Sequence, residues 1–126
     1  MPHVILSGTP DLSVIHKQFE PVRTDLNGWI IKIHHSLLSE HNRTVVYDCT
    51  AVRSGFSQDF YIRAELKDGR VSVRVDPYMR IERNEGVQRI IVYIAGLLLK
   101  TYPELAVSKS NIPEEILNGL RHDGGN

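Results

Sequence analysis

Apolar and polar residues alternate most regularly on the two sides of the pair Asp68-Gly69. Asp-Gly is a preferred two-residue hairpin turn, because both positions can take positive φ and the turn then twists with its strands. With this pair at the tip, the strands align as Lys67–Arg70, Leu66–Val71, Glu65–Ser72, Ala64–Val73, Arg63–Arg74, Ile62–Val75 and Tyr61–Asp76. Apolar residues then face apolar residues, and a slip by one position would break these matches. The sequence therefore predicts a hairpin in this register.

Three other segments are predicted to be strands: residues 3–7, residues 44–52 and a short edge strand at 105–109. Residues 29–39 fit two patterns. As a strand, the segment places Trp29, Ile31, Ile33 and Leu37 on one side; as a helix, Ile30, Ile33, Leu37 and Leu38 share a face. We favour the strand, because tryptophan and isoleucine suit a pleated surface and lose side-chain freedom in a helix. Asn27-Gly28, residues 40–43 and residues 53–58 are predicted breaks or loops.

Helical spacing of apolar residues appears in three places. Residues 10–20 form the first helix, which Thr9 could cap with Pro10 at its first position, and Pro21 ends it. Residues 83–102 form the longest helix, with an apolar stripe made by Val87, Ile90, Ile91, Ile94, Leu97 and Leu98. A short helix over residues 112–120 begins at Pro113.

These elements predict an α+β fold: an antiparallel β-meander of about four strands, packed on one face by a long C-terminal helix and a shorter N-terminal helix. The length suits one domain, which we expect to span residues 1–120. The glycine-rich segment 121–126 is expected to be a disordered tail.

Charge and cysteine content narrow the function classes. Acidic and basic side chains number fifteen each, so no overall field attracts nucleic acid or an anionic membrane. The single cysteine, Cys49, cannot form an internal disulfide, which indicates a reducing compartment, by default the cytoplasm. No apolar run reaches the roughly 20 residues that cross a bilayer. No motif for a nucleotide or covalent cofactor is present, so we expect no cofactor.

The polar face of the predicted hairpin carries the first candidate site. Its register sets Arg63 directly across from Arg74, and like charges in that position are unfavourable unless an acid lies beside them. Arg70 extends the same face toward the tip, and Tyr61 follows it at the other end. Paired guanidinium groups suit a carboxylate or phosphate, which predicts an anion- or partner-binding site. In the alternative interpretation, Asp48, Asp76 or Glu65 merely neutralises a surface pair.

The second candidate is Pro2, because a penultimate proline allows removal of the initiator methionine and would expose a secondary amine. The opening Met1-Pro2-His3, with a strand directly behind it, and the helix-then-strand pattern of residues 83–109 resemble the tautomerase superfamily. The resemblance implies that Pro2 acts as a general base on an enolisable keto acid, with Arg63 and Arg74 holding the carboxylate. If Met1 is retained, the Pro2 nitrogen is an amide without basicity.

Histidine and cysteine offer less. His34 and His35 are adjacent, so they point in different directions and cannot both bind one metal ion without further ligands. We therefore predict no metal site. Cys49, in a strand with Val45, Tyr47 and Ala51, is expected to be an unreactive core thiol.

A small sheet covered on one side leaves its other face open, and Ile30, Val46, Val52 and Tyr61 are expected there. A mixed apolar and arginine surface suits association. The sequence therefore favours a noncatalytic protein-interaction or adaptor module that self-associates or binds a protein partner. The alternative function is the N-terminal-proline tautomerase-like enzyme, and nucleic-acid binding is disfavoured.

Overall fold

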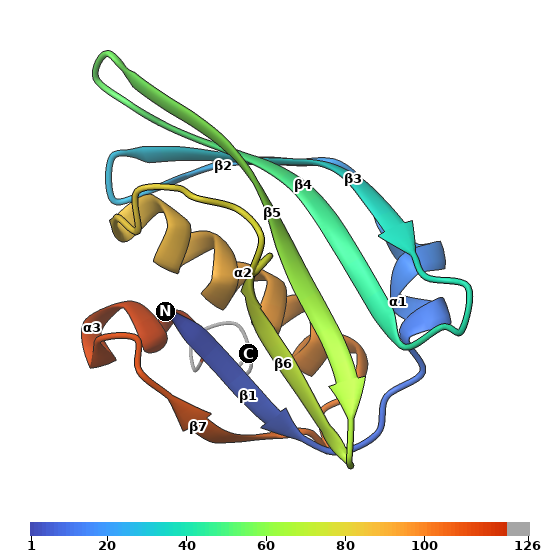
Figure 1. Ribbon diagram of the computed structural model, residues 1–126. Coiled ribbons are helices and arrows are strands. Elements are labelled where there is room, and N and C mark those ends of the chain that lie inside the picture. Colours follow the sequence, from blue (N-terminus) through green and yellow to red (C-terminus); the bar gives the residue numbers. More distant parts are fainter. Residues whose placement is uncertain (121–126) are drawn as a thin grey trace.

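The computed structural model describes residues 1–120, which form one antiparallel sheet of seven strands curved into a half-barrel. Helix α2 runs through the hollow of this sheet (Figure 1). In chain order the elements are β1 (His3–Ser7), α1 (Leu12–Gln18), β2 (Val22–Leu26), β3 (Trp29–Leu38), β4 (Thr44–Arg53), β5 (Phe56–Lys67), β6 (Arg70–Val75), α2 (Glu85–Thr101), β7 (Ala106–Ser110) and α3 (Glu114–Leu117). Across the sheet the strand order is β2-β3-β4-β5-β6-β1-β7.

The predicted hairpin is confirmed in its register. All six strand pairs from Lys67–Arg70 to Ile62–Val75 occur as the sequence pattern requires. Beyond the last pair, the Asp76 amide donates to the Tyr61 carbonyl at 2.9 Å. Asp68 and Gly69 at the tip have φ of 53° and 75°, the positive values that a two-residue turn of this hand needs.

The predicted four-stranded meander is wrong, because two tight turns were read only as breaks. Asn27-Gly28 joins β2 to β3, and Ser54-Gly55 joins β4 to β5; all four residues have positive φ. The expected loop at 53–58 is therefore a two-residue turn, and a strand that was not predicted starts at Val22. Strand β1 then pairs with β6, and β7 adds to β1, which brings the sheet to seven strands.

Residues 29–38 form a strand, as favoured, but the odd-numbered side chains point inward in its first half and outward in its second half. Trp29, Ile31 and Ile33 are buried, as expected. The pairing of β3 with β4 then shifts between Ile33 and His35, which is the mark of a β-bulge. Because the extra residue reverses the alternation, Leu37 lies on the outer face and is 57% exposed, so its predicted place beside Ile33 is wrong.

The helices are shorter than the apolar spacing suggested. Helix α1 begins after Asp11, whose carboxylate accepts the Ser13 amide at 2.9 Å, so Asp11 rather than Thr9 is the cap. It ends at Gln18 because Phe19 is already extended. Pro113 caps α3 instead of occupying its first turn.

Helix α2 confirms the predicted apolar stripe, but it is not the end of the chain. Its N-cap is Asn84, whose side chain accepts the Val87 amide at 3.1 Å. Strand β7 and the four-residue helix α3 follow it, so the described chain has no long C-terminal helix. The predicted tail 121–126 lies outside the described residues, and the domain limits of 1–120 remain a prediction.

The two faces of the sheet differ in what covers them. The inner face packs against α2, which contacts β1, β3, β4 and β6, and inward-facing residues such as Val4, Ile62 and Val73 are fully buried. No helix of the described chain covers the outer face, where Ile30, Val46 and Val52 are half-buried and Tyr61 is exposed. The predicted residues of the open face are therefore confirmed in position.

Candidate functional site

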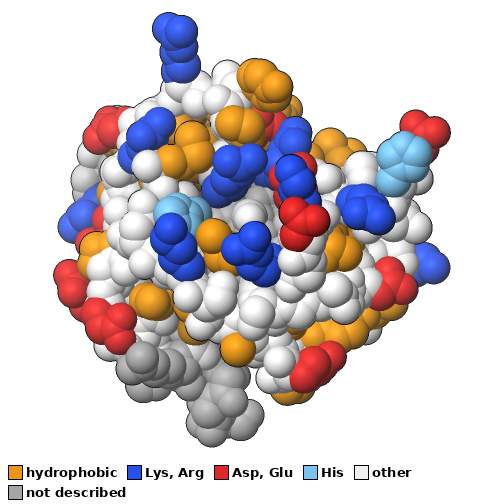
Figure 2. All heavy atoms as spheres, turned by 60° about the horizontal axis from the view of Figure 1, so that its bottom comes forward, with side chains coloured by type: hydrophobic (Ala, Val, Ile, Leu, Met, Phe, Trp, Pro, Cys, Tyr) orange, Lys and Arg blue, Asp and Glu red, His pale blue; other side chains and the backbone are white. Residues whose placement is uncertain are grey.

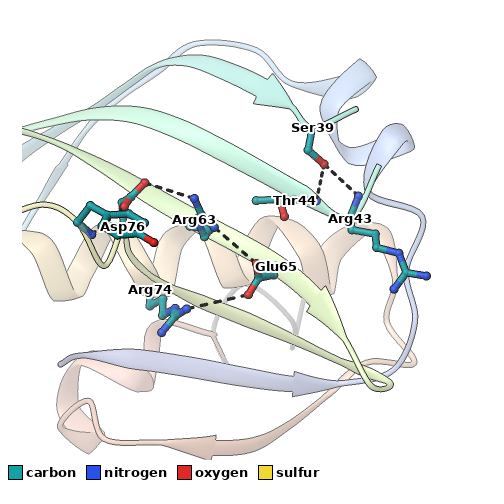
Figure 3. Close-up of polar contacts among 8 residues, drawn as sticks. Ser39, Arg43, Thr44, Arg63, Glu65, Arg74 and Asp76 are labelled. Atoms are coloured by element: carbon teal, nitrogen blue, oxygen red, sulfur yellow. Dashed lines mark hydrogen bonds and ion pairs between the residues drawn. The ribbon is translucent and has the colours of Figure 1, made fainter. Parts of the chain in front are cut away.

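Arg63 on β5 and Arg74 on β6 lie side by side on the outer face of the sheet (Figure 3). Their strand neighbours Ile62, Ala64 and Val73 are buried, and the alternation of a strand therefore turns both arginines outward. The guanidinium side chains are 26% and 36% exposed, so their stems lie along the sheet while their ends reach the surface.

Two acids hold this arginine pair in place. Glu65 bridges it, with Oε2 at 3.5 Å from Arg63 Nη1 and Oε1 at 4.0 Å from Arg74 Nη2. Asp76 Oδ2 lies 3.6 Å from Arg63 Nη2. Asp48, the third acid expected here, instead contacts His35 at 3.2 Å. Glu65 and Asp76 therefore partly neutralise the arginine pair, as the interpretation of a neutralised surface pair required.

These ion pairs are loose. A strong hydrogen bond between a guanidinium and a carboxylate is about 2.7–2.9 Å long and often double, whereas the closest pair here is 3.5 Å. The Nε atoms of Arg63 and Arg74 are buried and have no hydrogen-bond partner among residues 1–120. A partly exposed pair at such distances contributes little to stability. An incoming carboxylate could therefore displace Glu65 or Asp76 at small cost.

The other predicted site residues extend this surface. Tyr61 lies two residues before Arg63 on the same side of β5 and is 42% exposed. Arg70 is exposed at the hairpin tip, opposite Lys67. Viewed from the side of β1 and β7, Lys and Arg side chains gather near the middle of the visible face, with acidic and hydrophobic side chains among them (Figure 2).

A shallow hollow of about 220 Å³ adjoins the arginine pair between β1, β6 and β7. It is lined by Met1, His3, Ile5, Ser72, Arg74 and Lys109. The register pairs His3 with Arg74, and the His3 Nε2 atom is buried with no partner in the described chain. The hollow therefore adds one further cationic side chain, Lys109, to the face of the arginine pair and places a buried imidazole nitrogen beside Arg74.

Pro2 lies immediately before this hollow and is buried. The Met1 carbonyl accepts a hydrogen bond from Asn111 Nδ2 at 2.8 Å, and the His3 amide donates to Asn111 Oδ1 at 2.9 Å. Pro2 thus directly precedes β1, which lies beside the strand that carries Arg74, while Arg63 is one strand further away.

The histidines make contacts that sequence reasoning missed. His34 Nε2 lies 2.8 Å from the Thr50 hydroxyl, which donates to Asp59 Oδ1 at 2.6 Å. These two hydrogen bonds link β3, β4 and β5. They also depend on the bulge after Ile33, so no local sequence pattern predicts them. Within residues 1–120, no three His, Cys, Asp or Glu side chains meet in a way that could hold a metal ion.

Cys49 is buried, as predicted, beside Tyr47 and Ala51. Burial raises the pKa of its thiol, and the neighbouring Asp48 carboxylate acts in the same direction. Because the thiolate is the reactive form, this cysteine is a poor nucleophile.

Comparison with known proteins gives no family model, curated protein or solved structure that matches this chain. In the part of the chain that the structure describes, no helix has the length and apolar character needed to cross a membrane.

Proposed function

We propose that this protein is a noncatalytic interaction module that binds a carboxylate-bearing segment of a protein partner on the outer face of its sheet. The observation that carries the proposal is the pair of guanidinium groups, Arg63 and Arg74, held only by loose ion pairs. A partner carboxylate would form the paired hydrogen bonds that Glu65 and Asp76 do not make.

The surroundings of the pair favour a protein over other anions. Val46 lies directly opposite Arg63 on the neighbouring strand, and Tyr61 stands exposed beside them. Arginine and tyrosine next to apolar side chains are typical of the centres of protein interfaces. The balanced charge of the chain gives no support to nucleic acid. A buried free thiol suits the cytoplasm, which we propose as the compartment.

The test is a titration of the protein with a dye-labelled oligoglutamate peptide, followed by fluorescence anisotropy, with oligoglutamine as the uncharged control peptide. Replacing both Arg63 and Arg74 by Ala is expected to weaken oligoglutamate binding by more than about tenfold. Arg23→Ala is the control for losing an arginine, because it removes one such side chain from an exposed position on β2, at the far side of the sheet. This control should bind the peptide about as well as the unaltered chain.

Equal binding by the double variant and by Arg23→Ala would show that the arginine pair is only a neutralised surface feature. Self-association is the competing outcome, and sedimentation of the unmodified protein over a range of concentrations measures it. A dimer that the double variant abolishes would make a second copy of this chain the partner.

The alternative function, a proline tautomerase, is favoured by one observation. Pro2 adjoins a hollow in which Arg74 and Lys109 could hold a carboxylate. The mechanism requires a chain lighter by one methionine, which intact mass spectrometry detects. It also requires that enol–keto conversion of phenylpyruvate be lost in Pro2→Ala. Phenylpyruvate conversion at the uncatalysed rate by the unaltered protein would exclude the enzyme.

A further inference from the structure

A larger cavity lies on the other side of the sheet, at the open end of the half-barrel, and has a volume of about 750 Å³. Small-molecule sites typically measure about 300–1,000 Å³, so this one has the size for a ligand. Its lining residues come from α1, β2, β4 and α2 and are Ile15, Gln18, Phe19, Glu20, Pro21, Val22, Arg23, Thr24, Tyr47, Tyr93, Leu97, Lys100 and Thr101.

The walls of the cavity combine apolar and aromatic side chains with polar ones in similar measure. Tyr93, Leu97 and Lys100 follow one another at helical spacing on a single face of α2. Phe19, at the end of α1, packs against Tyr47 with ring centroids 5.7 Å apart. Thr101 donates to Gln18 Oε1 at 3.3 Å, which links the end of α2 to the end of α1 at the rim.

Tyr47 gives the cavity its polar group. Its side chain is 1% exposed, and the residue lines the cavity. Burial raises the pKa of this hydroxyl, so it stays protonated and can donate. A ligand with an acceptor in this cavity could therefore accept a hydrogen bond from the hydroxyl.

The charges around the cavity do not select an ion. Lys100 and Glu20 are both exposed lining residues, and their charges offset each other. Arg23 pairs with Lys32 across β2 and β3, between Val22 and Thr24, whose partners Ile33 and Ile31 are buried. The Arg23 side chain therefore points to the outer face. An ionised ligand would lose hydration here without gaining a paired charge.

We propose that this cavity binds an uncharged, largely apolar small molecule carrying a carbonyl or similar acceptor, to which the Tyr47 hydroxyl donates. The site is separate from the arginine pair, since the two lie on opposite faces of the sheet. Its proposal is therefore independent of the function proposed for the outer face.

The test uses prodan, an uncharged naphthalene ketone dye whose emission moves to shorter wavelength in an apolar, non-donating environment. Saturable binding with blue-shifted emission is expected for the unaltered protein. Leu97→Trp should weaken binding by more than about tenfold, because the larger indole would occupy the part of the cavity next to α2. Tyr47→Phe should weaken it by about three- to tenfold and shift the emission further to the blue, because a hydrogen bond to the ketone is lost. Thermal unfolding of each variant shows that it is folded.

Tyr61→Phe is the matched control, since it removes the same atom from the outer face and should leave prodan binding unchanged. Equal prodan affinity in Leu97→Trp, Tyr47→Phe and the unaltered protein would overturn the proposal. A second dye of similar size, anilinonaphthalene sulfonate, tests the charge selection and should bind more weakly than prodan. Tighter binding of the sulfonate, lost in Lys100→Ala, would contradict an uncharged ligand.

Discussion

The outer and inner faces of the sheet are built from alternate residues of the same strands, yet they offer different chemistry. On β5, Ile62 is fully buried against the core, whereas the next residue, Arg63, reaches the surface. The outer face presents charges that are already partly paired and remain open to exchange. The inner face carries a cavity lined by both apolar and polar side chains, with the buried residue Tyr47 in its wall.

The comparison shows how one short sequence can carry two independent surfaces. Under the two proposals, affinity on the outer face should depend on charge and be weakened by salt, because exposed ions are screened. Affinity on the inner face should depend on apolar area and on one hydrogen bond, and salt screens neither of them. Experiments that change one kind of interaction should therefore leave the other face unaffected.

The largest contrast is expected from neighbouring substitutions on β5. Ile62→Ala should lower the free energy of unfolding by about 2–5 kcal/mol, because it leaves a void in the fully buried core. Arg63→Ala should change it by less than about 1 kcal/mol, since loose, partly exposed ion pairs contribute little. Urea unfolding measures both. Similar losses of unfolding free energy in the two variants would contradict the claim that only the inner face contributes strongly to stability.

Salt should separate the two binding reactions. Raising sodium chloride from about 50 mM to about 500 mM is expected to weaken oligoglutamate binding by about tenfold. Prodan affinity should stay within about twofold over the same range. Parallel titrations at the two salt concentrations measure this. A prodan affinity that changed strongly with salt would contradict binding in the cavity without ionic contacts.

The inner face should tolerate little added volume near Trp29. A methyl group at Gly86 would lie 2.5 Å from the Trp29 ring, which is itself packed against Phe56. Overpacking costs about 1–3 kcal/mol, and the helix preference of alanine returns about 1 kcal/mol. Gly86→Ala should therefore destabilise the protein by about 1 kcal/mol. The control is Gly119→Ala, whose methyl group meets Val92 at an ordinary 3.6 Å, and no loss is expected there.

The smallest effect concerns Glu85, where α2 meets the β2–β3 turn. Hydrogen bonds from Arg89, and then from Asn27, lower the pKa of this carboxyl. Since the folded pKa lies below the unfolded one, the stabilisation is present above the unfolded pKa and is lost as pH falls through the folded pKa. Glu85→Gln should be slightly less stable near neutral pH and equal to the unaltered chain in strong acid. A gap that persists in acid would contradict the assignment.

Local signals explain what could be predicted from the sequence. The turn at Asp68-Gly69 fixed its own register, and with it the opposition of Arg63 and Arg74. The same reasoning applied to Asn27-Gly28 would have found the β2–β3 hairpin, but that pair was read only as a break. The number of strands was therefore underestimated because this turn was not recognised, although the sequence pattern for it was present.

Other features had no local signal. The pairing of β1 with β6 joins segments far apart in the chain. The alternation of apolar and polar residues along a strand does not show which other strand it pairs with. The bulge after Ile33 reversed the faces of β3 and turned Leu37 outward. The cavity depends on α1 ending at Gln18, whereas the apolar spacing extended that helix through Phe19. Tyr47 could be placed in a core strand from the sequence, but its position in the wall of the cavity could not.

The most direct test of two separate sites is calorimetric titration of two variants, Leu97→Trp and the double Arg63→Ala and Arg74→Ala variant, with both probes. We predict that the tryptophan variant loses prodan binding and keeps oligoglutamate binding. The arginine variant should lose oligoglutamate binding and keep prodan binding. A variant that loses both probes while its thermal unfolding is unchanged would contradict the account, because the two faces would then form a single site.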